Sequence, residues 1–166
     1  MKQTNPSPIR NVAFASYPGA GKTTLCEALA WSTGTIPSMG SILQGNTIGD
    51  FEPEETHRHH SVGSDLFQLD WQGTKINILD CPGTLDFFFE VKSGLRAVDG
   101  VVLVVSAATG YRSEMERVWD LIQELELPCL MFINDLDKDR TDYPSVVEEC
   151  QKALECSPVP LVVPAG

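Results

Sequence analysis

The sequence predicts an α/β fold, a three-layer sandwich in which a mostly parallel sheet with one antiparallel hairpin has helices on both faces. First, short apolar runs alternate along the chain with longer segments of helical periodicity, an order that favours parallel strands covered by helices. Second, residues 101–105 and 129–133 are continuously apolar, as strands buried on both faces are. Third, the short segment 71–74 joins two apolar runs as a hairpin turn does.

The N-terminal elements surround a glycine-rich turn. Residues 1–9 are polar and contain Pro and Ser, and we expect a disordered lead-in there. Residues 11–15, NVAFA, predict a short strand, and residues 22–31 predict a helix with leucines four residues apart on one face. Residues 32–60 show no periodicity. A loop of that length inside a compact domain indicates a functional or mobile segment.

The middle of the chain predicts the hairpin, a helix and a buried strand. Residues 62–70 and 75–79 are the two hairpin strands, joined by Trp71-Gln72-Gly73-Thr74. Residues 85–98 show the spacing of an amphipathic helix. The β-branched run at 101–105 follows as a central strand.

The C-terminal part repeats the alternation once more. Residues 112–125 predict an amphipathic helix and 129–133 a buried strand. Asp142 is expected to cap a further helix that has Pro144 in its first turn. Residues 158–166 can start one more strand, but their three prolines confine it to a sheet edge.

Length and composition indicate one soluble domain, which we place at residues 10–157. The balance of 12 basic against 23 acidic residues gives a net charge of −11, which disfavours non-specific binding to nucleic acid. We expect no sequence-specific nucleic-acid binding by this domain. The longest apolar run, residues 100–108, is about half of a membrane span, so no membrane partner is expected. Five scattered cysteines and the absence of a secretory signal favour a cytoplasmic protein with reduced thiols.

Residues 16–23, Ser-Tyr-Pro-Gly-Ala-Gly-Lys-Thr, match the phosphate-binding P-loop pattern between a strand and a helix. Backbone N–H groups of such a loop point at phosphate oxygens, and Gly19 and Gly21 permit the curvature that this requires. Lys22 is expected to reach the β- and γ-phosphates, and the Thr23 hydroxyl to bind Mg²⁺. Ser16 departs from the pattern, which has Gly there, and predicts a strained or weakened loop. The predicted nucleotide-binding residues here are Pro18, Gly19, Ala20, Gly21, Lys22, Thr23 and Thr24.

Two later motifs decide which nucleotide is favoured. Asp80-Cys81-Pro82-Gly83 follows a strand, where the Asp80 carboxylate can hold the water shell of Mg²⁺ and the Gly83 N–H can sense a γ-phosphate. Asn134-Asp135-Leu136-Asp137 ends another strand. The Asp137 carboxylate can accept both N–H groups of a guanine edge, a pairing that adenine does not offer.

These motifs, in this order, resemble those of translational GTPases of the elongation factor G group, across residues 11 to about 166. The similar segments are Ala20-Gly-Lys-Thr-Thr-Leu25, Asp50-Phe-Glu-Pro-Glu-Glu55, Asp80-Cys-Pro-Gly83 leading to Asp86-Phe87, Glu90-Val91, Ala97-Val-Asp-Gly100 and Phe132-Ile-Asn134. The resemblance implies the P-loop NTPase fold, GTP or GDP as ligand, Mg²⁺ as cofactor, and the ribosome as a partner of the full-length protein. It also implies that residues 158–166 open an inserted subdomain and that the domain is truncated.

The resemblance further implies roles for particular residues. Residues 45–62 would be switch I and 80–98 switch II. Ser61 lies where the family has a Thr or Ser that closes over Mg²⁺ and the γ-phosphate. Asn134 would connect the guanine-binding loop to the P-loop.

Two positions depart from the family pattern. Thr84 replaces the histidine that positions the attacking water, and it lacks the reach and the pKa of an imidazole. Asp135 replaces the lysine whose stem packs on the base, and it adds negative charge near the pocket. Lys138 lies close enough in sequence to compensate, a question that the sequence leaves open.

The leading hypothesis is therefore a Mg²⁺-dependent GTP-binding domain with slow or absent hydrolysis. Its candidate catalytic residues are Lys22, Gly83 and Thr84. Its candidate metal ligands are Thr23, Ser61 and Asp80. The alternative is a pseudo-GTPase, an interaction domain that has lost the nucleotide chemistry. An ATP-dependent P-loop kinase or ATPase is a third interpretation, disfavoured because the Asn134–Asp137 motif has no role there. His57, His59 and His60 could suggest zinc, but we interpret them as polar loop residues because no Cys or further His completes a site.

Overall fold

The computed structural model describes residues 8–49, 52–58, 61–139 and 141–165, and every structural statement concerns these residues. Three features expected from the sequence lie outside them. These are residues 1–7 of the expected lead-in, the pair Asp50-Phe51 of the acidic motif, and two of the three clustered histidines, His59 and His60.

The described chain forms one five-stranded sheet whose strand order is β2-β3-β1-β4-β5. Only β2 and β3 pair antiparallel, and the other neighbours are parallel, which confirms the mostly parallel sheet with one hairpin at an edge. The strands are β1 (Ile9–Ala15), β2 (Asp65–Trp71), β3 (Thr74–Asp80), β4 (Gly100–Ser106) and β5 (Cys129–Asn134).

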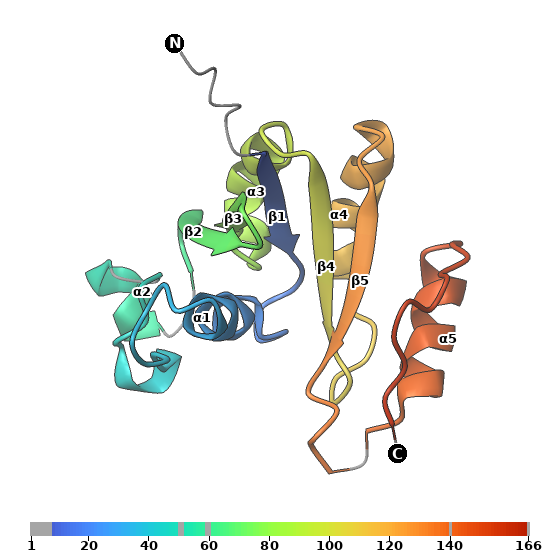
Figure 1. Ribbon diagram of the computed structural model, residues 1–166. Helices are drawn as coiled ribbons and strands as arrows, with labels where there is room; N and C mark the ends of the chain where they lie inside the picture. The colour runs from blue at the N-terminus through green and yellow to red at the C-terminus, as the bar shows by residue number, and fades with distance from the viewer. Residues whose placement is uncertain (1–7, 50–51, 59–60, 140, 166) are drawn as a thin grey trace.

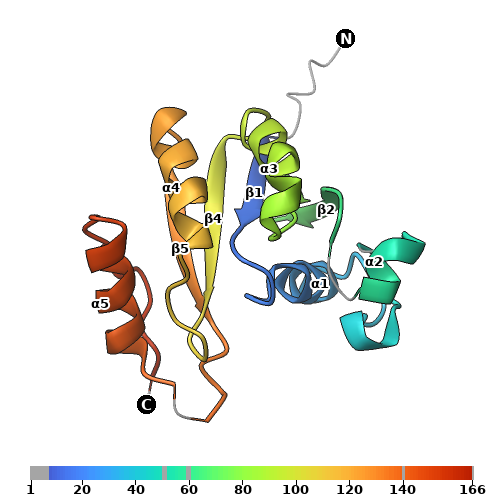
Figure 2. The same ribbon diagram turned by 180° about the vertical axis from the view of Figure 1, so that it is seen from behind.

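Helices lie on both faces of this sheet. The helices α3 and α4 cover the face that is turned to the viewer in Figure 2, and α1 packs against β2 and β3 on the other side. The helix α5 lies beyond the β5 edge (Figure 1). The α-helices are α1 (Lys22–Ser32), α2 (Pro53–Arg58), α3 (Phe88–Leu95), α4 (Glu114–Glu124) and α5 (Tyr143–Ala153); two 3₁₀ turns are η1 (Ile42–Gln44) and η2 (Leu85–Phe87).

The buried core lies between the sheet and its helices, and β4 and α4 contribute several of its fully buried residues. Leu103, Val104 and Val105 of β4 are fully buried, as expected for a central strand with apolar residues on both faces. Met115 and Ile122 of α4 are also fully buried and lie two turns apart, so the amphipathic helix predicted from 112–125 presents its apolar stripe to the sheet.

Several elements begin or end elsewhere than the sequence predicts. β1 begins at Ile9, which pairs with Lys75, so the last residue of the expected lead-in belongs to the sheet. The strand expected from residue 62 begins only at Asp65, because the N–H groups of Val62 and Gly63 donate to the Glu55 carboxylate at 2.9 and 3.1 Å instead of to a strand.

Two segments differ from the expected helices and loops. The helix predicted over 85–98 is divided into η2 and the shorter α3, which ends at Leu95. Residues 32–60, expected to be an irregular loop, contain η1 and α2. Residues 158–165 form no strand in the described chain, because their prolines lack the N–H donors that a ladder needs.

The hairpin turn follows the prediction. Trp71 pairs with Thr74, and the two residues between them, Gln72 and Gly73, have φ angles of 48° and 79°. Positive φ at both central residues is the geometry of the two-residue turns that match the twist of a hairpin.

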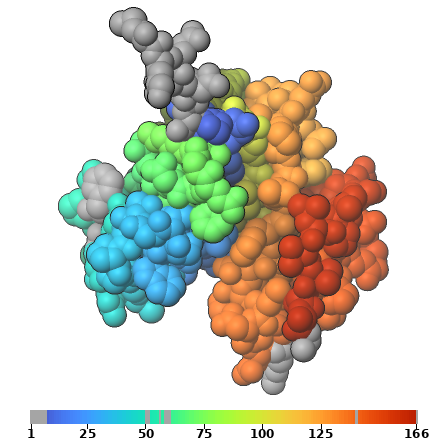
Figure 3. Space-filling model, viewed as in Figure 1, coloured from blue at the N-terminus to red at the C-terminus, as the bar shows by residue number. Residues whose placement is uncertain are grey.

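The parallel strands bring their carboxyl ends to one edge of the sheet. Phe14 of β1 lies beside Asp80 of β3, and Ser106 of β4 lies beside Asn134 of β5. Ligands of open α/β sheets bind outside the carboxyl ends of the strands. In the space-filling view the blue atoms that follow β1 and the orange atoms that follow β5 lie on either side of a recess at this edge (Figure 3).

Candidate functional site

A cavity of about 410 Å³ opens at this edge of the sheet. Its volume falls within the range of small-molecule sites. The loop after β1 and the loop after β5 form its two walls. The lining residues are Pro18, Gly19, Gly21, Lys22, Thr23, Thr24, Ile42, Ser61, Gly83, Asn134, Asp135, Asp137 and Lys138.

The loop after β1 has the geometry of a phosphate-binding loop. Gly19 and Gly21 have φ angles of 79° and 93°, and α1 begins directly after Gly21. A Cβ atom at Gly21 would lie 2.2 Å from the Asn134 amide nitrogen, so this position admits only glycine. The N–H groups and the positive dipole end of α1 then face the cavity, which favours an anion there.

Ser16 does not strain this loop. It is absent from the described non-glycine residues with positive φ, so a serine fits where the pattern has glycine. Its hydroxyl oxygen is buried and has no hydrogen-bond partner among the described residues. The strain expected at this position is therefore not observed.

A hydroxyl and a carboxylate meet at the phosphate end of the cavity. Thr23 Oγ1 donates to Asp80 Oδ2 at 2.5 Å, and Asp80 is fully buried at the end of β3. Hard divalent cations prefer oxygen ligands, and Mg²⁺ in nucleotide sites keeps several ligands from water and phosphate. The described residues hold no group of three or more His, Cys, Asp or Glu side chains arranged for a metal. The Thr23 hydroxyl and the Asp80 carboxylate are oxygen donors of the type that Mg²⁺ prefers.

The turn after β3 packs directly on the P-loop. A Cβ atom at Gly83 would lie 2.6 Å from both the Pro18 nitrogen and the Tyr17 carbonyl carbon, so glycine is required there as well. Thr84, the next residue, precedes η2 and is half-buried. It does not belong to the cavity lining in the described part of the chain. Of the candidate catalytic residues, Lys22 and Gly83 reach the cavity wall.

The two walls are joined by a contact that the resemblance predicts. Asn134 Nδ2 donates to the Ala20 carbonyl at 3.0 Å, across 114 residues of sequence. Ala20 is fully buried and contributes this carbonyl and no part of the lining. Asp137 is exposed and lines the cavity beyond Asn134. The same loop therefore holds the P-loop in place and presents a carboxylate to the ligand space.

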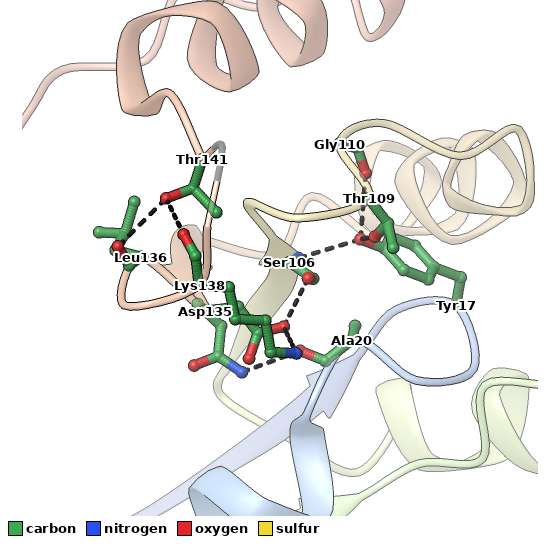
Figure 4. Close-up of polar contacts among 10 residues, drawn as sticks. Tyr17, Ala20, Ser106, Thr109, Gly110, Asp135, Leu136, Lys138 and Thr141 are labelled. Atoms are coloured by element: carbon green, nitrogen blue, oxygen red, sulfur yellow. Dashed lines mark hydrogen bonds and ion pairs between the residues drawn. The ribbon is translucent and has the colours of Figure 1, made fainter.

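Tyr17 is a site residue that the sequence did not reveal. Its hydroxyl lies 2.7 Å from Thr109 Oγ1, donates to the Gly110 carbonyl at 3.0 Å and accepts from the Ser106 N–H at 2.9 Å (Figure 4). The ring is buried, with 3% of its surface exposed. Tyr17 thereby connects the P-loop to the end of β4. A tyrosine at a variable P-loop position carries no sequence signal for this role.

Glu27 is a buried carboxylate of α1 that organises the long loop after this helix. It is fully buried and accepts hydrogen bonds from the N–H of Gly40 at 2.9 Å and of Ile48 at 2.5 Å. A lone acidic residue on the apolar face of a helix is the only sequence signal for this role. Because Ile42 of this loop lines the cavity, Glu27 helps to position a part of the wall.

Glu55 of α2 has a similar role next to Ser61. Its side chain is 2% exposed and accepts from the N–H groups of Glu52, Val62 and Gly63. Val62 directly follows Ser61, which is buried and lines the cavity. The structure thus places Ser61 in the lining of the same cavity as Thr23.

Burial makes the cysteine near the site unreactive. Desolvation, assisted by the neighbouring Asp80 carboxylate, raises the pKa of the Cys81 thiol to about 12. The thiolate is the nucleophilic form, so Cys81 does not act as a nucleophile near neutral pH.

Comparison with known proteins supports the interpretation of the cavity. A family model described as "Elongation factor Tu GTP binding domain" matches residues 7–163. "Ribosome-releasing factor 2, mitochondrial" of Drosophila willistoni is 35% identical over 165 residues, which are 99% of this chain and 22% of that protein. "Elongation factor G 2" of Borreliella burgdorferi is 35% identical over 158 residues, 95% of this chain and 24% of that protein.

A solved structure has a similar fold. A crystal structure of a protein from Thermus thermophilus superposes with a TM-score of 0.85 at 34% identity, covering 89% of this chain and 22% of that chain. The chain therefore spans about a quarter of the length of these relatives, or slightly less. Among the described residues, no helix combines the length and the apolar character that crossing a bilayer requires.

Proposed function

Because this chain belongs to the elongation-factor family of GTP-binding domains and is of the elongation factor G type, we propose that it binds GDP and GTP, with Mg²⁺, in the cavity described above. The observation that carries the proposal is the contact between Asn134 and the Ala20 carbonyl. It joins a P-loop to a loop that carries the Asp137 carboxylate, and both loops line one cavity, which supports binding of phosphate and guanine together.

At the phosphate end, each residue has a distinct proposed task. The backbone N–H groups from Gly19 to Thr24 bind phosphate oxygens, and the Lys22 ammonium neutralises their charge. Lys22 Nζ lies 3.3 Å from the Tyr17 carbonyl, which holds the side chain along the loop. Thr23, Ser61 and Asp80 are the proposed ligands of Mg²⁺, directly or through water. Bound Mg²⁺ would supply positive charge for the β- and γ-phosphate oxygens.

At the base end, Asp137 is the proposed specificity residue. Its carboxylate lines the cavity and can accept two N–H groups from a guanine edge. Asn134 is already engaged with the P-loop, so its proposed role is to hold the two walls together.

We propose that hydrolysis by this domain is slow or absent. Thr84 takes the position of the usual histidine, and it lies outside the described cavity lining. A hydroxyl group also provides no general base near neutral pH. The same observation favours a second candidate, a pseudo-GTPase that binds nucleotide weakly or not at all and acts as an interaction domain.

Partners beyond the nucleotide are proposed for the longer protein. The relatives are named as an elongation factor and a ribosome-releasing factor, and the chain spans about a quarter of their length. We propose that a full-length protein of this kind acts on the ribosome. One relative is named as mitochondrial and another is bacterial, so a cytoplasmic location stays a prediction.

The test is titration of a fluorescent GDP analogue into the purified chain with Mg²⁺, followed by competition with GDP and ADP. We expect displacement by GDP and not by ADP. The variant Lys22→Ala should lose most of the affinity, whereas Lys92→Ala, an exposed lysine of α3, should retain it. Displacement by ADP as effective as by GDP would contradict guanine specificity. A folded chain without binding would support the pseudo-GTPase.

A further inference from the structure

The cavity wall contains a carboxylate that is poorly suited to an anionic ligand. Asp135 lines the cavity, and its side chain keeps 17% of its surface exposed. Asp137 lines the same end of the cavity. The chain has a net charge of −11, and a nucleotide adds further negative charge. A second free carboxylate there would weaken binding by repulsion.

Asp135 is nevertheless firmly held by two partners. Its Oδ2 accepts from Ser106 Oγ at 2.5 Å and lies 3.0 Å from Lys138 Nζ (Figure 4). Ser106 is the buried last residue of β4, so it holds the carboxylate from the interior side. Asp135 has a φ angle of 61°, a conformation that Asp and Asn tolerate better than most residues.

The backbone around Lys138 is fixed as well. The Lys138 N–H donates to the Asp135 carbonyl at 3.2 Å. Thr141 Oγ1 contacts the carbonyls of Leu136 and Lys138 at 3.1 and 3.0 Å, which closes the loop (Figure 4). The Lys138 side chain therefore extends from a constrained turn toward Asp135 and the end of β4.

This arrangement places a cation and an apolar stem at the base end. Lys138 lines the cavity while its ammonium group pairs with Asp135. Among the described residues, no ion pair joins Lys138 to Asp137, so the Asp137 carboxylate stays accessible to the ligand. Lysine stems commonly pack along flat apolar groups while the ammonium group stays in water.

We propose that Asp135 is a positioning residue that holds Lys138 against the base end of the cavity, where the lysine stem packs on the bound guanine. Lys138 would thus supply the packing that a lysine at position 135 would otherwise provide. The inference rests on the proposed function, because it requires a guanine nucleotide in this cavity.

The test is a double-mutant cycle on GDP affinity with Lys138→Ala, Asp135→Asn and the double variant. Asp135→Asn keeps the size and the backbone preference but removes the charge that holds Lys138. We expect each single change to weaken GDP binding by about threefold to tenfold. A loss of this size is what one exposed ion pair and the packing of about one methylene group together contribute. The two losses should not add in the double variant.

Matched variants separate this role from a structural one. Lys138→Arg retains a charged stem and should keep most of the affinity. Lys152→Ala removes another lysine paired on its own helix, 2.5 Å from Glu148, and should change nothing. The thermal unfolding midpoint without nucleotide should be nearly the same in all these variants, because both members of each pair lie at least partly exposed.

Two results would overturn the inference alone while the unmodified chain still binds GDP. One is unchanged affinity in Lys138→Ala. The other is tighter binding in Asp135→Asn, which would show that the carboxylate only repels the nucleotide. If the unmodified chain binds no guanine nucleotide, the proposed function fails and this inference fails with it.

Discussion

At the scale of single residues, the site depends on close approaches that leave no room for a larger side chain. Gly21 lies against the Asn134 amide, and Gly83 against the Tyr17–Pro18 backbone. The polar groups are equally constrained, because Tyr17 satisfies the buried N–H of Ser106. A small change at one of these positions should therefore affect both walls of the cavity.

Gly21→Ala should destabilise the fold and weaken GDP binding. The new Cβ would meet Asn134 Nδ2 at 2.2 Å, and alanine would also have to adopt a φ angle of 93°. The matched control is Gly73→Ala, which has a φ of 79° but no neighbouring atom within 4 Å. Left-handed strain alone costs about 1–2 kcal/mol, so urea unfolding should show a clearly larger loss for Gly21→Ala. Equal losses would contradict the role of the Asn134 contact.

Tyr17→Phe should lower the free energy of unfolding by about 1–3 kcal/mol, because it leaves the Ser106 N–H without its partner inside the protein. The ring itself keeps its packing. Chemical denaturation followed by intrinsic fluorescence measures the loss. The control is Tyr143→Phe at the start of α5, a tyrosine on an element that does not line the described cavity. An unchanged free energy of unfolding in Tyr17→Phe would show that water replaces the hydroxyl as the partner of the Ser106 N–H.

At the scale of elements, the segment between α1 and β2 is held by acceptors from two helices. From the described residues of this segment, Glu27 of α1 and Glu55 of α2 together accept five backbone hydrogen bonds. These bonds replace the regular ladder that a strand or helix would supply. Ile42 and Ser61, which line the cavity, lie in the segment that they organise. Its conformation is therefore decided by two buried carboxylates more than by local periodicity.

Glu27→Gln should loosen this segment selectively. One carboxylate oxygen becomes an NH₂ group that faces a backbone donor, so one of the two bonds to Gly40 and Ile48 is lost. Amide hydrogen exchange at these two residues should accelerate by about tenfold, corresponding to about 1.4 kcal/mol. Exchange in β4 should change much less. Glu124→Gln, at the exposed end of α4, serves as the control, and equal effects of both variants would contradict this role.

At the scale of the whole molecule, the candidate site residues lie together at the edge of the sheet where the parallel strands have their carboxyl ends. The rest of the sheet and the helices hold this edge in place. The P-loop follows β1, Asp80 ends β3, Ser106 ends β4 and Asn134 ends β5. The strand β5 closes the described sheet, and its Leu130 and Phe132 keep 54% and 41% of their surfaces exposed. The buried core includes residues of β1, β2, β3 and β4 and of the helices, among them Cys150 of α5.

Stability of the whole fold should decline at alkaline pH. Burial, reinforced by Cys156 and Glu149, raises the pKa of the Cys150 thiol from 9.0 to about 11. The folded pKa lies above the unfolded one, so this contribution is complete below about pH 9 and is lost as the pH rises through about 11. The urea midpoint should fall mainly between about pH 9 and about pH 11. The fall should be smaller in Cys150→Ala, and an equal fall in both proteins would exclude Cys150 as a cause.

The sequence by itself determined the fold class, the order of most elements and the two motif loops. These features depend on local information, since a continuous apolar run such as residues 101–105 or a Gly-Ala-Gly-Lys-Thr pattern specifies its own geometry. The hairpin turn at Gln72 and Gly73 was predictable for the same reason. The family resemblance added one long-range contact, the bond between Asn134 and the P-loop.

Only the tertiary structure decided which other distant groups meet. The pairing of Asp135 with Ser106 and Lys138 depends on how the ends of β4 and β5 lie side by side, and the bonds of Tyr17 depend on the loop after β4. Glu27 likewise meets backbone donors 13 and 21 residues away. No periodicity encodes such contacts, because they arise from strand order and from the need to satisfy buried polar groups.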